Sequence, residues 1–361
     1  MTQTHPTTGR EVDPDKLMSF VFRAVEEVGS ALNGALVVMG DQLGYYRDLA
    51  EHGPSTPEEL ASRTGTEEHY AREWLNCQAA GSYVEYDAGT GRYLLPPEQA
   101  VAFTDTNSPA YLPGLFQIAH GTIRDTPSIV AAARQGSGVG WHEHNADVHV
   151  GCERFFAPSY QAHLIGEWLP ACEGVTEKLA DGARVADVGC GHGASTILMA
   201  QAFPEAHFVG SDYHHASIAT ARERAEEAGV SDQIDFIAEA AQVIDGEGFD
   251  LVTTFDCLHD MGDPVGAARH IRGLLKDDGT WMIVEPAAGD EVQDNFNPVG
   301  RAYYGFSTLL CTPTSLAQDV GLALGTQAGP ARIKEVVMEG GFSRFDLVAQ
   351  TPFNNVFEVR P

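Results

Sequence analysis

Basic residues are scarce in this sequence of 361 residues. Only 22 lysines and arginines accompany 51 aspartates and glutamates, which gives a formal net charge of −29 at pH 7. A surface this acidic repels phosphate backbones and anionic lipid headgroups, so nucleic acids and membranes are expected to be poor partners. The charge does not by itself identify a substrate.

Long apolar runs and paired cysteines are also missing. No apolar run approaches the roughly 20 residues that span a bilayer, and the polar start MTQTHPTTGREVDPD lacks the pattern of a signal peptide. We therefore expect a cytoplasmic protein whose first dozen residues are loose. Without CxxC spacing, the six cysteines are predicted to be free thiols, not a disulfide framework or a zinc site: Cys77, Cys152, Cys172, Cys190, Cys257 and Cys311.

The N-terminal part has the outline of a winged helix. Residues 16–51 are helical in pattern, and Ser55 or Thr56 can then cap a helix that has Pro57 in its first turn. A second helix is expected to end near Gly81, and the turn AGTG between YVEYD and RYLL predicts a hairpin.

A winged helix that reads DNA normally carries a basic surface. Residues 56–95 instead contain seven acidic groups and three arginines, a local charge of −4. We therefore predict a structural or dimerisation role, with a cofactor-sensing transcription regulator as the alternative.

From Ala183 onward, short β-rich runs alternate with helical stretches. This alternation predicts a doubly wound, Rossmann-like parallel sheet in an α/β domain. The last two runs, FDLVAQ and NVFEVR, are too close for a crossover helix and should form an antiparallel edge hairpin. We expect a helical winged-helix domain at residues 1–107, a helical connector at 108–180, and the α/β domain at 181–361.

The first strand of this domain ends in the glycine-rich stretch ADVGCGHGAS. Gly189, Gly191 and Gly193, with Cys190 among them, follow the strand and open a helix. Glycines in this place permit a tight turn and a close approach of the backbone to a ligand. The loop alone fits NAD as well as S-adenosylmethionine.

Three acidic positions favour S-adenosylmethionine. Asp187, just before the glycines, would oppose a pyrophosphate but suits the ammonium group of a methionine. Asp212, followed by Tyr213, ends the next strand and is placed to accept from the ribose hydroxyls, which fits both cofactors. Glu239 and Ala240 end a further strand and suit an adenine amino group. An NAD-dependent oxidoreductase remains the alternative enzyme class, against which Asp187 and the edge hairpin argue.

These residues carry a family resemblance. With DVGCGHG as first motif and Asp212 on the second strand, residues 183–361 resemble a class I S-adenosylmethionine-dependent methyltransferase. The whole chain is similar to actinobacterial methyltransferases with an N-terminal winged helix and to small-molecule O-methyltransferases that dimerise through that domain. The resemblance implies S-adenosylmethionine as cofactor, a small-molecule acceptor and a homodimer. Glu239 departs from the pattern, because aspartate is commoner there.

The stretch FDCLHDMGDP follows the fourth strand, DLVTTF, so residues 256–260 lie beyond the strand end that faces the cofactor. We expect Asp256 to contact the cofactor. The resemblance implies that His259 is the general base that takes the proton from an acceptor hydroxyl. Asp260 would orient the ring or cap the next helix. An ordinary loop histidine bonded to backbone is the structural alternative.

A metal is the catalytic alternative. His259 and Asp260 would hold it, with Cys311 or one of three other histidines, and it would give Lewis-acid help to a keto or enol acid methylated at carbon. The three histidines are His142, His144 and His149. Our preferred interpretation has no metal and predicts O-methylation, with N- or S-methylation as further alternatives.

Apolar candidates for the acceptor site lie in two segments. Residues 294–326 follow the fifth strand, where an insertion would cover the strand ends. The stretch ERFFAPSY is expected to precede a helix over the cofactor, and the resemblance implies apolar contacts there. Core packing explains either set equally well. The candidates are Phe155, Phe156, Tyr303, Tyr304, Phe306 and Cys311.

Overall fold

The computed structural model of the chain describes residues 11–361. The expectation of a loose start lies almost wholly outside them. The chain divides into two compact units, one reaching to Thr106 and including Ala110–His120, and the other formed by Asn107–Pro109 and Gly121–Pro361. The three-part division at residues 107 and 180 stays a prediction. No helix among residues 11–361 has the length and apolar character needed to cross a membrane.

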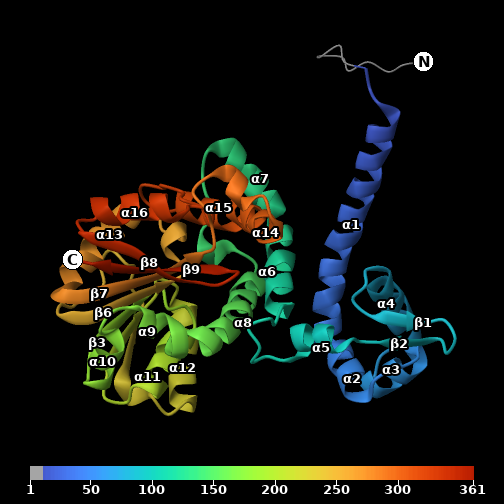
Figure 1. The fold of residues 1–361 in the computed structure, drawn as a ribbon, viewed down its shortest axis with the longest axis horizontal. Coiled ribbons are helices and arrows are strands. Elements are labelled where there is room, and N and C mark those ends of the chain that lie inside the picture. Colours follow the sequence, from blue (N-terminus) through green and yellow to red (C-terminus); the bar gives the residue numbers. More distant parts are fainter. Residues whose placement is uncertain (1–10) are drawn as a thin grey trace. The chain divides into compact units, whose positions relative to one another are not determined.

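The first unit has the expected order of helix, turn, helix and hairpin. Thr56 caps α3 in a capping box with Glu59, because its side chain accepts from the Glu59 N–H while Glu59 binds the Thr56 N–H. Gly65, at φ +68°, ends that helix. The elements in Figure 1 are α1 (Pro14–Gln42), α2 (Tyr45–His52), α3 (Pro57–Thr64), α4 (Glu68–Ala80), β1 (Glu85–Asp87), β2 (Arg92–Leu94) and α5 (Pro97–Thr104).

Large aromatic side chains fill the core of this unit. Tyr45 and Tyr46 pack edge-on against the Trp74 ring, with ring centroids 4.9 and 5.0 Å away. Trp74 lies so close to Gly40 that any Cβ there would overlap the indole, at 2.4 Å from its Cζ2. This close packing lets α1 lie against α4.

A helical segment precedes the sheet. It comprises α6 (Pro113–Arg124), whose last turn lies in the second unit, α7 (Thr126–Gln135), η1 (Trp141–Glu143), α8 (Ala146–His163), the π-helical turn η2 (Leu164–Trp168), α9 (Leu169–Ala171) and α10 (Val175–Ala180). Here one prediction was wrong: Phe155 and Phe156 do not precede a helix but lie inside α8. The Asn145 side chain caps α8 well upstream, and the helix continues through Pro158.

The sheet confirms the predicted Rossmann-like α/β architecture. Its order is β5-β4-β3-β6-β7-β9-β8, parallel except for β9, which pairs antiparallel with β7 and β8. The terminal hairpin is therefore present, with β8 as the edge strand and the last strand inserted beside β7. The strands are β3 (Arg184–Val188), β4 (His207–Ser211), β5 (Ile234–Ile237), β6 (Phe249–Phe255), β7 (Leu275–Pro286), β8 (Arg344–Gln350) and β9 (Asn354–Arg360).

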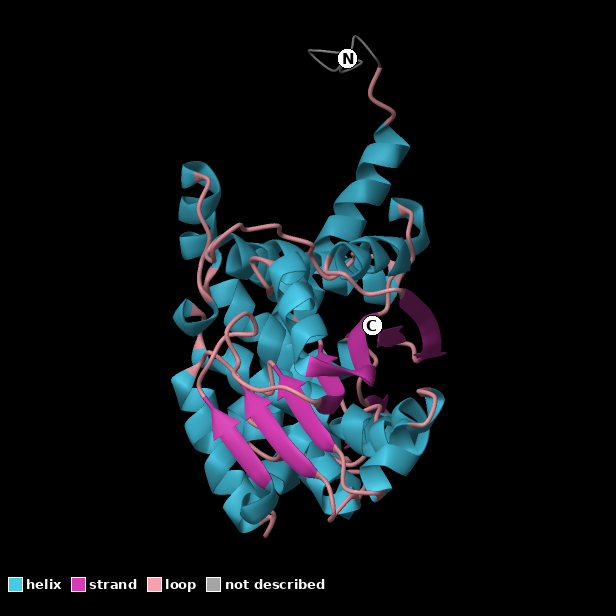
Figure 2. Ribbon diagram, turned by 90° about the vertical axis from the view of Figure 1, so that its left-hand side faces the viewer, coloured by secondary structure: helices cyan, strands magenta, loops and turns pink. Residues whose placement is uncertain are grey.

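Helices cover both faces of this sheet (Figures 1 and 2). On β3, Val185 joins the core beneath α11 (Ala194–Ala202) and α12 (His215–Glu227), whereas Ala186 and Val188 join the core beneath α13 (Pro264–Leu274) and α16 (Pro330–Glu339). This alternation follows from the two-residue period of a strand. The remaining elements are α11 (Ala194–Ala202), α12 (His215–Glu227), η3 (Ser231–Gln233), η4 (Leu258–Asp260), α13 (Pro264–Leu274), η5 (Val292–Asn295), α14 (Pro298–Phe306), the π-helical turn η6 (Ser307–Cys311), α15 (Thr312–Leu316) and α16 (Pro330–Glu339).

Candidate functional site

The glycine loop after β3 requires its glycines for two different reasons. Gly189, Gly191 and Gly193 have φ angles of +77°, +54° and +77°, a region that side chains with a Cβ rarely adopt. A Cβ on Gly189 would lie 2.6 Å from Cys257 Sγ, and one on Gly193 would lie 2.7 Å from Phe236 Cζ. A Cβ on Gly191 would meet nothing within 4 Å. Gly191 therefore faces open space, as a loop that cradles a ligand must.

Replacing Gly193 with alanine is expected to lower the free energy of unfolding by about 1–3 kcal/mol, because left-handed strain and overpacking against Phe236 add. Thermal or denaturant unfolding measures this change. The matched control is Gly273→Ala, a glycine inside α13 with open space around its Cα, which should stabilise by about 0.5–1 kcal/mol. Equal effects of the two changes would refute this account of the loop.

Asp187 has a different environment from the one expected. Its carboxylate is fully buried and accepts from the hydroxyls of Ser195, Thr196 and Thr253, at 2.7, 2.6 and 2.9 Å. Burial raises the pKa of Asp187, and these three hydrogen bonds oppose the rise. The side chain is thus committed to holding the glycine loop and the start of α11. Its contact with a methionine ammonium group stays a prediction.

Asp212 lies beside the loop as expected. One carboxylate oxygen accepts from the Gly191 N–H at 3.0 Å and the other from the His214 N–H at 2.8 Å. Burial raises the pKa of Asp212. Because an ionised carboxylate offers about four acceptor positions, the group retains capacity for a second ligand, as ribose recognition requires. Its neighbour Tyr213 is 42% exposed.

Two further acidic candidates have buried oxygens in need of a donor. Among residues 11–361, no donor forms a hydrogen bond with Glu239 Oε2 or with Asp256 Oδ2. Buried acceptors usually find a partner, so both atoms fit a ligand that brings N–H or O–H groups, such as adenine. Asp256 also adopts a left-handed φ of +49°, and Asn354 donates to its other oxygen at 2.8 Å. Ala240 lies half-buried beside Glu239.

Helix α8 is tied to the glycine loop. The Glu153 carboxylate lies 2.8 Å from His192 Nδ1 and also pairs with Arg224 of α12. His192 belongs to the loop sequence DVGCGHG. Although the aromatic pair lies inside this helix and not before one, α8 does pack over the predicted cofactor loop.

His259 is buried beyond β6 and is held by a carboxylate from the neighbouring strand. Its Nδ1 lies 2.5 Å from Glu285 Oε2, while Glu285 Oε1 accepts from the Leu258 N–H at 2.9 Å. Burial alone would lower the pKa of His259, but the carboxylates of Glu285 and Asp260 outweigh it and raise that pKa well above the usual value. Glu285 thus fixes both the ring and the loop that carries it.

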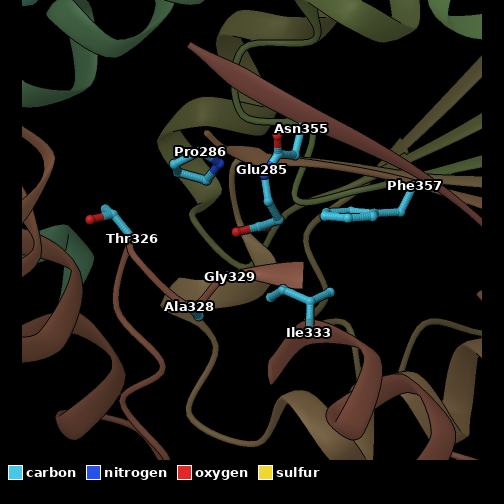
Figure 3. Close-up of a pocket in the computed structure, with 8 residues that line it drawn as sticks. All are labelled: Glu285, Pro286, Thr326, Ala328, Gly329, Ile333, Asn355 and Phe357. Carbon is cyan, nitrogen blue, oxygen red and sulfur yellow. The ribbon is translucent and has the colours of Figure 1, made fainter. Parts of the chain in front are cut away.

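Sequence reasoning missed Glu285. The signal was present: IVEP closes the strand after DLVTTF, and the carboxyl ends of neighbouring parallel strands meet at one edge. The observed pairing of Phe255 with Val284 puts Glu285 one residue further along that edge. Figure 3 shows Glu285 with Asn355 and Phe357 of β9 at a small cavity. This cavity has room for no more than about one water molecule, so it is too small for an acceptor.

Asp260 and Cys311 complete a buried group around His259. Nε2 of His259 lies 3.3 Å from Asp260 Oδ1. The Cys311 sulfur and one ligand atom each from His259 and Asp260 all lie within 4.8 Å of one another. Burial raises the pKa of Asp260 and raises that of Cys311 to about 12. The sequence named all three as possible metal ligands, although the preferred prediction had no metal.

The predicted insertion does cover the loop that carries His259. Gln318 Nε2 donates to the Asp260 carbonyl at 2.8 Å, Ser315 Oγ donates to the Met261 carbonyl at 2.8 Å, and the Leu322 N–H donates to the Gly262 carbonyl at 2.9 Å. Residues 294–326 therefore pack on the strand ends and fix the loop after β6.

The apolar candidates are divided between site and core. Phe155 contacts the Phe353 ring, and the Tyr303 hydroxyl donates to the Phe353 carbonyl at 3.0 Å. Phe156 stacks on Tyr160 and packs against the core of the sheet. Phe156 and Tyr303 thus have packing contacts, and a contact of Phe155, Phe156 or Tyr303 with an acceptor stays a prediction. Tyr304 and Phe306 lie half-buried on α14, and their place in an acceptor pocket stays a prediction.

The three other histidines are not part of the close ligand set around His259, although His144 interacts electrostatically with Asp260. His144 Nδ1 lies 3.0 Å from an Asp125 oxygen and its Nε2 lies 3.4 Å from Thr314 Oγ1. His149 stacks on His214, and burial lowers the pKa of His149 to about 4. In the described part of the chain, the close set of possible metal-ligating atoms consists of His259, Asp260 and Cys311 without these histidines.

Two families match this chain. Residues 179–326 match a family described as methyltransferase domain, and residues 31–105 match the Rv2258c-like winged HTH domain. A 50-residue segment is 52% identical to a trans-aconitate 2-methyltransferase of Variovorax paradoxus, covering 14% of this chain and 19% of that protein. A 106-residue segment is 33% identical to a ubiquinone biosynthesis O-methyltransferase of Ruegeria pomeroyi, covering 29% and 41%. The chain thus spans less than half of the length of these curated relatives.

Two solved structures resemble almost the whole chain. Human N-acetylserotonin methyltransferase, in complex with S-adenosylmethionine, covers 94% of this chain and 97% of its own, with a TM-score of 0.70 and 16% identity. A mitomycin 7-O-methyltransferase covers 97% and 100%, with a TM-score of 0.69 and 18% identity. At these identities the likeness is one of fold.

Proposed function

Residues 179–326 are an S-adenosylmethionine-dependent methyltransferase domain, and from this premise we propose that the chain methylates a hydroxyl group of a small molecule. The observation that carries the proposal is the His259–Glu285 pair at the carboxyl end of β6, beside the glycine loop. The reactive form is the neutral imidazole, in which Nδ1 donates to Glu285 and the Nε2 lone pair accepts the acceptor's proton. Because the pKa of His259 is raised, the population of this form increases as the pH rises.

The chain's own residues have distinct tasks in this reaction. S-adenosylmethionine, when bound, supplies an activated methyl group for an in-line displacement. Asp212 and the amides of the glycine loop bind the ribose side, and Glu239 Oε2 accepts from the adenine. Glu285 holds His259, which takes the hydroxyl proton. Residues 294–326 exclude water from the strand ends and align the acceptor.

Other reactions are separated by one experiment. A screen of phenols, keto acids and amines with methyl-labelled cofactor, with products identified by mass spectrometry, assigns the methylated atom. A labelled methyl ether supports this proposal, while a C-, N- or S-methyl product would overturn the O-methyl assignment. Calorimetry in which NAD binds and S-adenosylmethionine does not would favour the oxidoreductase alternative.

We also propose that the protein is a homodimer in the cytoplasm. The six cysteines are all free, as suits a reducing compartment. One stripe of α1 exposes Met18, Phe22, Val25 and Leu32, at 48, 67, 63 and 64%. Contiguous apolar patches of this kind mark interaction sites, and a second copy is a self-complementary partner. The proposed interface buries on the order of 2,000 Å² in total.

The double substitution of Phe22 and Val25 by aspartate is expected to convert a dimer to a monomer, because two charges would be buried at the interface. Light scattering measures the mass. Arg23→Glu, which also changes charge but lies about 140° around α1 from the centre of this stripe, is the matched control and should leave the dimer intact. A wild-type protein that is monomeric at micromolar concentration would overturn the proposal, as would specific DNA retention at physiological salt in favour of the regulator alternative.

A further inference from the structure

The atoms around His259 are arranged as a metal site is arranged. An imidazole nitrogen, a carboxylate oxygen and a thiol sulfur, from His259, Asp260 and Cys311, lie within 4.8 Å of one another. Small side-chain movements bring three such atoms to the 2.0–2.3 Å at which zinc binds nitrogen, oxygen and sulfur. Three protein ligands with one open position are typical of a catalytic rather than a structural zinc site.

Glu285 supplies the outer partner that a metal-binding histidine needs. Metal-ligating histidines almost always donate their other ring N–H to a carboxylate or a carbonyl, which fixes the ring and its tautomer. Here Nδ1 faces Glu285 Oε2 at 2.5 Å, so Nε2 is the free nitrogen, and it is turned toward Asp260. Glu285 is 3% exposed, so its position is determined by packing.

Asp260 provides an independent observation. The 3.3 Å contact between His259 Nε2 and Asp260 Oδ1 lacks the geometry of a hydrogen bond, and no N–H or O–H group of residues 11–361 donates to this buried oxygen. A positive charge satisfies this contact, either as a second proton on the imidazole or as a metal ion between the two atoms. Three carboxyl groups, those of Asp256, Asp260 and Glu285, interact with this single imidazole.

The backbone explains how Cys311 reaches this place. It ends a π-helical turn, η6, between α14 and α15. Such π-bulges occur frequently at functional sites, because the extra residue redirects a side chain. Two anchors then fix the following helix, since the Val139 N–H donates to the Pro313 carbonyl at 3.0 Å and Ser315 donates to Met261.

From this geometry we propose that His259 Nε2, the Asp260 carboxylate and Cys311 Sγ bind one divalent transition metal, of which zinc fits the mixed N, O and S ligands best. This inference rests on the proposed function. A metal on Nε2 occupies the lone pair that would accept the hydroxyl proton, so metal binding and hydroxyl methylation exclude each other. The site is thus a switch by which a transition metal inhibits the enzyme.

Binding is tested on the full chain, stripped of metal with a chelator and titrated with zinc against a competing chelator. Cobalt substitution then provides a spectrum in which a thiolate ligand adds a charge-transfer band. We expect one equivalent of zinc per chain and that band. Cys311→Ser should abolish the band, and Cys311→Ser and Asp260→Asn should each weaken zinc binding on the order of a hundredfold. Glu285→Gln should weaken it about 10–100-fold but keep the band.

Cys77→Ser is the matched control, a half-buried thiol of the first unit, and it should bind zinc as the wild type does. Normal binding of S-adenosylhomocysteine shows that each variant is folded. Failure of the folded wild-type protein to bind zinc stoichiometrically would overturn the metal site, as would an unchanged cobalt spectrum in Cys311→Ser.

Turnover separates this inference from the proposed function. Zinc-loaded protein is expected to lose hydroxyl methylation, and chelation should restore it. If the zinc-loaded protein turns over faster than the zinc-free form, zinc is not an inhibitor and metal-free His259 is not the general base. The proposed metal site would still be correct. If no zinc binds but His259 is still needed for turnover, the metal site fails and the proposed function stands.

Discussion

Replacing His259 with alanine is expected to lower turnover of the metal-free protein about a hundredfold or more, the usual effect of losing a general base. The affinity for S-adenosylmethionine should hardly change, because in the proposed function the imidazole faces the acceptor and not the adenosine. Steady-state rates with the acceptor found by the screen, together with calorimetry of the cofactor, measure both quantities.

His207→Ala is the matched control for this change. His207 is exposed at the start of β4, at the opposite end of the strand from the cofactor loop, and its loss should leave turnover unaltered. If His259→Ala keeps wild-type turnover, His259 is neither a base nor a ligand for a metal that takes part in the reaction. If both histidine variants lose activity equally, the loss at His259 reflects stability and not chemistry.

Asp212→Ala is expected to weaken binding of S-adenosylmethionine by about 1–3 kcal/mol, because ribose hydroxyls would lose a buried acceptor. The change also frees the amides of Gly191 and His214, which Asp212 now holds. Calorimetry with S-adenosylmethionine and S-adenosylhomocysteine measures the loss. Asp232→Ala, an exposed carboxylate in η3, is the control and should bind both normally. Unchanged cofactor affinity in Asp212→Ala would remove this residue from the site.

Most of the fold could be predicted from local sequence patterns. The capping residues Thr56 and Glu59, the turn AGTG and the alternation of β-rich and helical runs all act through neighbours in the chain. For that reason the winged helix, the parallel sheet and the terminal hairpin could be predicted. ERFFAPSY was wrongly placed before a helix, because α8 begins upstream at its Asn145 cap and continues through Pro158.

Contacts between distant segments decided the chemistry of individual side chains. The position of Asp187 beside the glycines suggested a cofactor contact. The register of β3 with β6 also places Thr253 beside it, and two hydroxyls of α11 donate to the same carboxylate. The sequence gives no direct sign of this arrangement, because the partners come from three elements.

The sequence by itself determined that a nucleotide-type cofactor binds and at which end of the sheet the chemistry lies, since the glycine loop, Asp212 and the residues after DLVTTF follow from motif and strand order. The family resemblance then pointed to S-adenosylmethionine. Only the tertiary structure decided what His259 can do. Glu285 reaches its Nδ1 from the neighbouring strand, and Cys311 reaches its Nε2 side from a π-helical turn some 50 residues away in the chain. A side chain's proton and ligand partners depend on packing across the sheet edge, which no local pattern encodes.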